Sequence, residues 1–263
     1  RPWADILFFI YLFYLIQASY IIQQFRVKIN ILSIALCYTD DMIYPHLEKE
    51  KHHWEQGREF VVGIDEAGRG PLAGPVVAGA VIVFPYIIEE IQNAPEFKLI
   101  RDSKTLSAKQ REKAYDFITQ YFQWGAGICD EKTIDRVNIL QASFLAMKKA
   151  ISDLKSKTKR NPEIILIDGR SPIPNISIQQ ESIVSGDKFI FSISAASIVA
   201  KVTRDRIMLE YHEKYPQYDF AQHKGYGTKM HFEMIEKHGL CDIHRKSFCK
   251  KKGRKHLMTR HRP

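Results

Sequence analysis

Cysteine is scarce in this sequence, and no two cysteines stand close together. Four occur among the 263 residues, at positions 37, 129, 241 and 249. This spacing argues against a disulfide framework and predicts a reducing, cytoplasmic environment. One cluster of candidate zinc ligands is present, although its spacing matches no familiar zinc-binding pattern: His238, Cys241, His244, Cys249 and His256.

Acidic residues are absent from residues 250–263, where seven of the side chains are Lys or Arg. The formal net charge of the chain is +9, so this basic tail carries most of it and the remainder is only mildly basic. We expect the tail to be disordered. The tail either binds phosphates in a salt-sensitive, sequence-independent way or simply aids solubility.

Charged residues are also missing between Ile6 and Ile22, a stretch near the lower length limit of a membrane span. The sequence begins with Arg1, shows no small-residue cleavage site after this stretch, and has its first methionine at Met42. We therefore expect residues 1–41 to be an apolar leader from upstream translation, foreign to the native protein, in preference to a membrane anchor.

The remaining residues show no internal repeat and no sign of a second domain. Apolar, β-branched runs predict strands and amphipathic stripes predict helices, which together indicate an α/β fold with a central sheet. Ser107 and Gln110 form a capping box at the start of one helix. Strands are expected at residues 60–64, 75–84, 124–129 and 163–167, with an edge strand at 176–184, and helices within 42–59 and at 107–122, 133–154 and 194–215.

Two adjacent carboxylates, Asp65 and Glu66, follow the first strand and lead into a glycine-rich turn. Neighbouring side chains on a regular strand point to opposite faces, so the two can share one site only if the strand ends or bends there. Gly63, Gly68 and Gly70 permit such a bend. The alternative interpretation is a solvated turn that happens to be acidic.

The same pattern recurs after residues 163–167, where Asp168 and Gly169 follow an apolar strand. Ligand sites in open α/β sheets collect outside the carboxyl ends of the strands. Asp65 and Asp168 can therefore converge if their strands are parallel neighbours. A turn at residues 185–188 supplies a further carboxylate, Asp187.

The glycine-rich turn also resembles a dinucleotide-binding fingerprint, Gly68-x-Gly70-x-x-Ala73. That motif must open a helix, because the helix N-terminus holds the pyrophosphate. Pro71 and Pro75 interrupt the stretch and a strand is expected to follow, so the sequence argues against this cofactor site.

Carboxylates without a nearby cysteine pair favour a hard divalent cation, Mg²⁺ or Mn²⁺. Two such ions about 4 Å apart can activate water and stabilise the attacking and leaving oxygens during in-line attack on a phosphodiester. Without metal the carboxylates would repel one another and a polyanionic substrate. Ser197 and Lys201 lie one turn apart on a predicted helix. Basic and aromatic side chains are expected to supply phosphate contacts and a stacking surface: Arg69, Lys104, Lys201, His223, Lys224, Tyr226, Arg245 and Lys246.

Several of these motifs together resemble ribonuclease HII, the type 2 ribonuclease H, and they occur in that family's order over about residues 60–248. The motifs are Gly63-Ile64-Asp65-Glu66-Ala67-Gly68-Arg69-Gly70-Pro71, Asp102-Ser103-Lys104, Leu166-Ile167-Asp168-Gly169, Gly186-Asp187, Ala195-Ala196-Ser197-Ile198-Val199-Ala200-Lys201 and His223-Lys224-Gly225-Tyr226. The related type 3 enzymes usually lack the arginine in the Gly-x-Gly turn.

The resemblance implies a ribonuclease H-like mixed central sheet flanked by helices, with a helical C-terminal region, in a catalytic domain at residues 42–249. It implies that Asp65, Glu66, Asp168 and Asp187 are the catalytic, metal-binding residues. It further implies substrate contacts. Gly68, Arg69 and Gly70 would read the ribonucleotide 2′-hydroxyl, Tyr226 would pack on the sugar at the 3′ side, and Lys104, Ser197 and Lys201 would assist.

Enzymes of this kind cleave the RNA strand of RNA–DNA hybrids and nick duplex DNA 5′ to a misincorporated ribonucleotide, leaving 3′-hydroxyl and 5′-phosphate ends. The resemblance therefore implies a monomer that needs no obligate protein partner or membrane. The competing hypothesis is a non-catalytic nucleic-acid-binding protein on the same fold. Four intact carboxylates argue against it, because a pure binder gains nothing from negative charge facing phosphates.

Overall fold

A computed structural model describes residues 44–250. Its five-stranded sheet has the order β3-β2-β1-β4-β5, in which β2 pairs antiparallel with both β1 and β3, and β4 pairs parallel with both β1 and β5. The predicted mixed central sheet is thus confirmed. The strands are β1 (Val61–Ala67), β2 (Val76–Ile82), β3 (Gln123–Cys129), β4 (Ile164–Asp168) and β5 (Gln179–Ile183).

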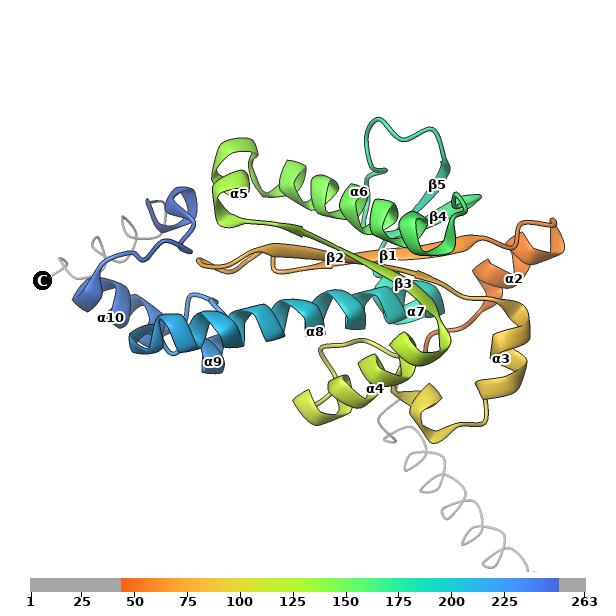
Figure 1. Cartoon of the computed structure of the whole chain (residues 1–263), viewed down its shortest axis with the longest axis horizontal. Coiled ribbons are helices and arrows are strands. Elements are labelled where there is room, and N and C mark those ends of the chain that lie inside the picture. Colours follow the sequence, from red (N-terminus) through yellow and green to blue (C-terminus); the bar gives the residue numbers. More distant parts are fainter. Residues whose placement is uncertain (1–43, 251–263) are drawn as a thin grey trace, which may run out of the picture. The chain divides into compact units, whose positions relative to one another are not determined.

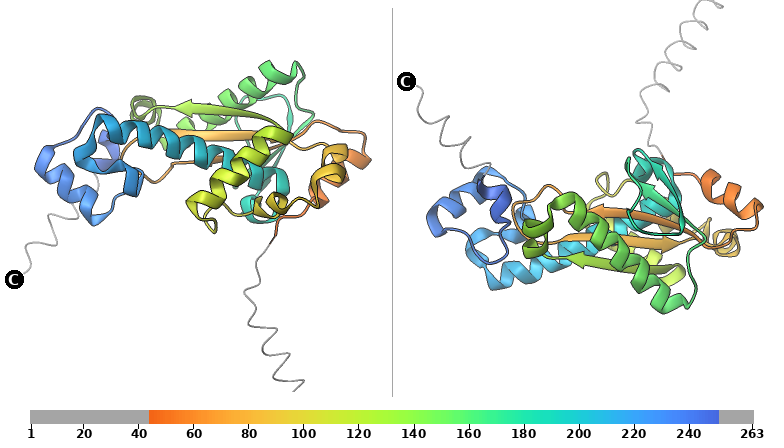
Figure 2. Two further views of the ribbon diagram at one scale, coloured as in Figure 1. Left: turned by 60° about the horizontal axis from the view of Figure 1, so that its bottom comes forward. Right: turned by 90° about the horizontal axis from the view of Figure 1, so that it is seen from above.

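Helices cover both faces of this sheet. The helix α6 packs on one face, and α8 and α4 pack on the other (Figure 1), an arrangement that both views of Figure 2 repeat. The helices are α2 (Glu48–Glu55), α3 (Pro85–Ile91), η1 (Pro95–Leu99), α4 (Ala108–Tyr121), α5 (Glu131–Val137), α6 (Ile139–Thr158), α7 (Gly186–Phe189), α8 (Phe191–Lys214), η2 (Pro216–Tyr218), α9 (Phe220–His223) and α10 (Lys229–His238).

The segments at the two ends of the chain bear on two predictions. The apolar leader at residues 1–41 lies outside the described residues, as does the basic tail apart from Lys250, so neither prediction is tested. Within residues 44–250, no helix is long and apolar enough to cross a membrane.

Some predicted boundaries were wrong. The single helix expected at residues 133–154 is two helices, α5 and α6, separated at Asn138, whose φ of 69° interrupts the helical path. The Asn138 side chain then accepts a hydrogen bond from the Gln141 amide, so it caps the second helix. The first strand continues past residue 64 to Ala67, and the edge strand β5 is shorter than expected.

Glycines let both helical layers approach the sheet closely. A Cβ atom at Gly63 or Gly79 would lie 2.2 to 2.3 Å from backbone atoms of α8. On the other face, a Cβ atom at Gly127 of β3 would lie 2.0 Å from the carbonyl oxygen of Ala146 in α6. Any side chain at these positions would push a helix off the sheet.

The start of α8 is fixed by a buried carboxylate from α2. Oε1 of Glu50 accepts a hydrogen bond of 2.8 Å from the Ser192 amide, one of the amides that the first turn of a helix leaves unpaired. Burial raises the pKa of Glu50, and the hydrogen bond to Ser192 opposes that shift. Because α8 spans the sheet, this cap also sets the position of the site residues farther along it.

We predict that Gly127→Ala lowers the free energy of unfolding by about 2 kcal/mol or more, because the added methyl meets helix backbone that cannot rotate away. Gly70→Ala is the matched control for stability, since its Cβ would have no neighbour nearer than 3.8 Å. Urea unfolding of both variants measures the difference. Equal losses would contradict the close-packing explanation.

Candidate active site

Three carboxylates converge at one edge of the sheet. Asp65 of β1, Asp168 at the end of β4 and Asp187 in α7 each place a carboxylate oxygen within 4.8 Å of the other two. The parallel pairing of β1 with β4 ends at Ile64 and Ile167, so the next residue of each strand emerges at the same place. The predicted convergence of Asp65 and Asp168 is therefore confirmed.

Glu66 lies beside this trio on the other face of the sheet. The strand β1 neither ends nor bends at Asp65, so the expected bend was wrong. Asp65 faces α8, where Ser197 hydrogen-bonds to it, whereas Glu66 lines a cavity of about 330 Å³ together with Asp168 and residues of α6 such as Ser143. Asp168 lies beyond the last pair of the β1–β4 ladder and borders both carboxylates.

The carboxylates oppose one another's ionisation. Burial raises the pKa of Asp65 well above its usual value, and the charges of Glu66 and Asp168 add to the effect. Burial and the charge of Asp187 likewise raise the pKa of Asp168. Burial also raises the pKa of Glu66, although its ion pair with Arg69 opposes this shift.

A hard divalent cation fits this donor set. The trio offers carboxylate oxygens only, with no thiolate or imidazole, and its repulsion is what a cation relieves. Three aspartates can share one ion, and Glu66 can join Asp168 in holding another. These cation-binding roles follow from the carboxylate chemistry of the four side chains.

Lys104 partly balances the charge of the trio. Its Nζ lies 2.8 Å from Oδ2 of Asp187, and 74% of the lysine side chain is exposed. Burial alone would lower the pKa of Lys104, but the hydrogen bond with Asp187 and the charges of Asp187, Asp102 and Asp65 together outweigh burial and raise it. The ammonium group therefore stays charged at the edge of the acidic site.

Of the two predicted α8 contacts, only Ser197 reaches the trio. Its Oγ lies 3.1 Å from Oγ of Ser103, and it also hydrogen-bonds to Asp65. Lys201 instead donates to Asp205, at 2.7 Å, and burial lowers the pKa of this lysine. Ser197 thus links the helix and the loop before α4 to the acidic site.

The glycine-rich turn and the Tyr226 loop meet next to the acidic site. A Cβ atom at Gly70 would lie 3.8 Å from the Tyr226 ring, and the Leu72 amide donates to the Gly225 carbonyl at 2.8 Å. The side chains of Arg69 and Tyr226 are both substantially exposed. Residues that the sequence proposed as substrate contacts therefore share one surface.

Two side chains expected to contact phosphate are buried instead. Arg245 is fully buried and donates to backbone carbonyls, and His223 is buried with both ring nitrogens hydrogen-bonded within the protein. Sequence reasoning also missed Arg204, which is fully buried on α8. Its helical spacing from the buried Ala200 and Met208 was the available signal.

Neutral histidines support the Tyr226 loop. The Cys241 amide donates to Nδ1 of His244, so Nε2 of His244 must carry the proton that it donates to Nε2 of His231, at 3.0 Å. Nδ1 of His231 then donates to the Tyr226 carbonyl at 2.9 Å. Burial lowers the pKa of both His231 and His244 to about 4.

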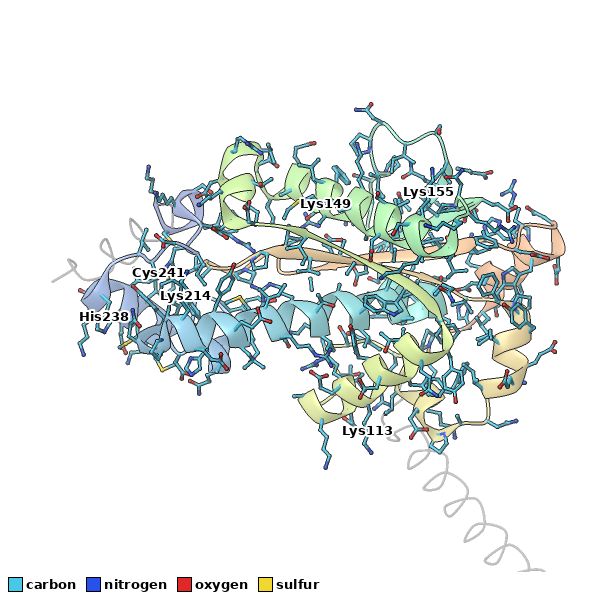
Figure 3. All side chains as sticks on the ribbon, in the orientation of Figure 1. Lys113, Lys149, Lys155, Lys214, His238 and Cys241 are labelled. Atoms are coloured by element: carbon cyan, nitrogen blue, oxygen red, sulfur yellow. The ribbon has the colours of Figure 1, made fainter. Side chains whose placement is uncertain are left out.

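The zinc hypothesis fails for its described members. His238 and Cys241 lie in the C-terminal helical region (Figure 3), where His238 is exposed and the Nδ1 of His244 is occupied by the Cys241 amide. Within residues 44–250, the only cluster of His, Cys, Asp or Glu that could hold a metal is the aspartate trio. His256 lies outside the described residues.

Comparison with known proteins identifies the family. The family model for ribonuclease HII matches residues 62–251. The chain belongs to the ribonuclease HII family. It is 51% identical over 202 residues to ribonuclease HII of Acetivibrio thermocellus, covering 76% of this chain and 74% of the relative. It is 46% identical over 207 residues to ribonuclease HII of Caldicellulosiruptor bescii, covering 78% of this chain and 94% of the relative.

Solved structures agree with the fold. Ribonuclease H2 from Pyrococcus horikoshii OT3 superimposes with a TM-score of 0.56 at 27% identity, covering 74% of this chain and 97% of that one. Bst-RNase HIII in complex with Mn²⁺ gives a TM-score of 0.61 at 17% identity, covering 76% and 70%, and supports the fold alone. As a ribonuclease HII, the chain is a divalent-metal-dependent ribonuclease that hydrolyses the RNA strand of RNA–DNA hybrids.

We predict that Asp168→Asn stabilises the protein without metal but abolishes its stabilisation by metal. Without divalent ions at pH 7, the variant should gain about 1 kcal/mol in unfolding free energy, because one repelling charge is gone. With Mg²⁺ or Mn²⁺, the melting temperature of the wild type should rise while that of the variant does not. Thermal unfolding with and without metal measures both. Asp116→Asn, at an exposed carboxylate of α4, should behave as the wild type.

We predict that His231 and His244 contribute to the free energy of unfolding and that acid removes this contribution. Their pKa values of about 4 lie below that of an unfolded histidine, about 6.5, so between these values the unfolded chain binds protons that the folded chain does not. Stability from this source is present above pH 6.5 and is lost as the pH falls toward 4.

Urea unfolding from pH 7 to 4.5 tests this prediction by comparing variants with the wild type. The loss in unfolding free energy should be smaller in His231→Gln, by at least about 1 kcal/mol, because one titrating ring is gone. His238→Gln, at an exposed histidine, should keep the wild-type pH dependence. Parallel pH profiles for all three proteins would rule out the explanation.

Proposed function

We propose that this ribonuclease HII also nicks duplex DNA 5′ to a single misincorporated ribonucleotide. It would leave 3′-hydroxyl and 5′-phosphate ends and use two Mg²⁺ or Mn²⁺ ions. The observation that carries the proposal is the placement of an acidic trio beside the turn of Gly68 to Gly70 and the exposed Tyr226 ring. One site can thus bind a cation and contact the sugar of the substrate.

The acidic residues would hold the ions in two groups that share Asp168. Asp65 and Asp187 form the trio with Asp168, and Glu66 lines a cavity with it. Ions in such sites supply water activation and stabilise the attacking and leaving oxygens of an in-line displacement. Lys104 is exposed, so its ammonium group can leave Asp187 for a substrate phosphate.

The turn and Tyr226 would select the ribonucleotide. Gly70 leaves the space next to the Tyr226 ring open, so a sugar can approach the backbone of the turn closely. A 2′-hydroxyl both donates and accepts hydrogen bonds, which distinguishes RNA from DNA at that position. Arg69 is held by its ion pair with Glu66, at 3.0 Å, and would help to place the sugar against the acidic site.

A non-catalytic nucleic-acid-binding protein is the competing function. It is disfavoured because the three aspartates lie within 4.8 Å of one another and repel one another, so they weaken binding to a polyanion unless a cation joins them.

We infer that the enzyme acts as a cytoplasmic monomer without an obligate protein partner. The acidic trio, the turn and the Tyr226 loop all come from a single chain. Cys129 and Cys241 form no disulfide within residues 44–250, as a reducing compartment favours.

A duplex DNA containing one ribonucleotide tests the proposal. With Mg²⁺ or Mn²⁺ the wild type should nick 5′ to the ribonucleotide, and Asp168→Asn should lower kcat by at least about 100-fold. Asp116→Asn is the control with an unchanged rate. End-labelled products separated by electrophoresis show the position and the chemistry of the cut. The absence of a nick, or an undiminished nick by Asp168→Asn, would count against the proposal.

A further inference from the structure

Two arginines are completely buried behind the turn that follows β1. Arg204 comes from α8 and Arg245 from the segment after α10, and both are 0% exposed. Their guanidinium groups donate only to backbone carbonyls. Arg245 donates to Gly68 at 2.7 Å, Arg69 at 3.1 Å, Gly74 at 2.9 Å and Pro75 at 3.0 Å, and Arg204 donates to Ala73 at 3.2 Å and Pro75 at 3.0 Å.

These hydrogen bonds fix the direction of the peptide planes in the turn. In a trans peptide the N–H of one residue points opposite to the C=O of the residue before it, and the described chain has no cis peptide bond. The carbonyls of Gly68 and Arg69 point inward to Arg245, so the amides of Arg69 and Gly70 point outward. Within residues 44–250, neither of these two amides has a hydrogen-bond acceptor.

The outward side of the turn is also its open side. A Cβ atom added at Gly70 would lie 3.8 Å from the Tyr226 ring, and the Arg69 side chain is 55% exposed. Two unused N–H donors therefore face the surface shared with Tyr226 and the acidic trio. A hydroxyl or phosphate oxygen is the chemistry that completes such donors.

The two guanidinium groups add positive charge behind these amides. Among the described residues, no carboxylate lies within ion-pair distance of either group. Burial lowers the pKa of Arg245 to about 9, and the charge of Arg204 adds to the effect. Backbone carbonyls accept all the hydrogen bonds of the two cations, and the charges of Asp205, Asp135 and Glu131 act on them only from beyond ion-pair distance, so their field favours an anionic group on the outer side of the turn.

We propose that Arg245, supported by Arg204, is a positioning residue for recognition of the ribonucleotide. It holds the Gly68 and Arg69 carbonyls inward, so that the amides of Arg69 and Gly70 are presented to the 2′-hydroxyl and its neighbouring phosphate. This role rests on the proposed function. It assigns to a buried side chain, which touches no substrate, the orientation of the groups that would touch it.

An arginine is required at position 245 because three of its nitrogens are used at once. Nε donates to the Gly74 carbonyl, Nη1 to that of Arg69, and Nη2 to those of Gly68 and Pro75, so the three nitrogens reach both sides of the turn. A lysine keeps the charge but offers one donor position and cannot bridge them. Arg245→Lys therefore separates geometry from charge.

The test compares two duplexes of the same sequence, one with a single ribonucleotide and one entirely DNA. Arg245→Lys should lower kcat/KM on the ribonucleotide duplex by about 10-fold or more, while its Kd for the DNA duplex, without divalent ions, changes by less than about 2-fold. Arg204→Lys should show a smaller loss of the same kind. Arg206→Lys, at an arginine of α8 that pairs with Glu112 on the surface, is the matched control and should match the wild type.

The outcomes distinguish a failure of the proposed function from a failure of the positioning role of Arg245. A wild type that fails to nick the ribonucleotide duplex overturns the proposed function and this role together. A wild type that nicks it, with Arg245→Lys unchanged or with both duplexes affected equally, overturns only the positioning role.

Thermal unfolding first checks that each variant is folded at the assay temperature. If Arg245→Lys does not fold, the positioning role is tested by Arg204→Lys and by amide hydrogen exchange in the wild type. The amides of Arg69 and Gly70 should become protected by the ribonucleotide duplex and not by the DNA duplex, without divalent ions. Equal protection by both duplexes contradicts the proposal.

Discussion

The mutual repulsion of closely placed carboxylates is the constraint on which this structure depends. Asp65 and Asp168 are held together although burial disfavours both ionised forms, and the charges of Glu66 and Asp168 add to the effect at Asp65, as that of Asp187 does at Asp168. The sheet enforces the contact, since β1 is paired on both sides up to Ile64 and its parallel neighbour β4 ends at the same edge. Flexible loops could let such groups separate. Strand ends cannot, so the fold keeps a site whose charges a cation must balance.

The helix α8 connects this acidic edge to the rest of the site. It lies close to the sheet because Gly63 and Gly79 have no side chain, and Glu50 fixes its first turn. From that one helix, Ser197 reaches Asp65 and Arg204 reaches the turn after β1. The position of the carboxylates and the shape of the turn are therefore set by the same rigid element, and a shift of the helix would disturb both.

The sequence predicted those features that local pattern controls. Apolar runs that end in an acid located β1, β4 and the carboxylates, and the capping box at Ser107 is present. The break at Asn138 was missed because one residue with positive φ interrupts an unbroken apolar stripe. Arg245 was misjudged because its basic neighbours suggest exposure, whereas its burial depends on a turn more than 170 residues away. Glu66 was expected to need a bend, but Asp168 lies where it can border both faces of β1.

The positive charges around the site divide into two kinds according to their freedom to move. Lys104 and Arg69 are more than half exposed, and each pairs with a carboxylate of the site, Asp187 and Glu66. Such pairs can open when a cation or a phosphate offers a better partner. Arg204 and Arg245 are buried and bound to carbonyls, and breaking those bonds would leave a charge without compensation. The histidines behind the Tyr226 loop are neutral near pH 7 and add no third charge. The exposed cations can therefore respond to the substrate, whereas the buried cations keep the geometry of the turn constant while the substrate changes.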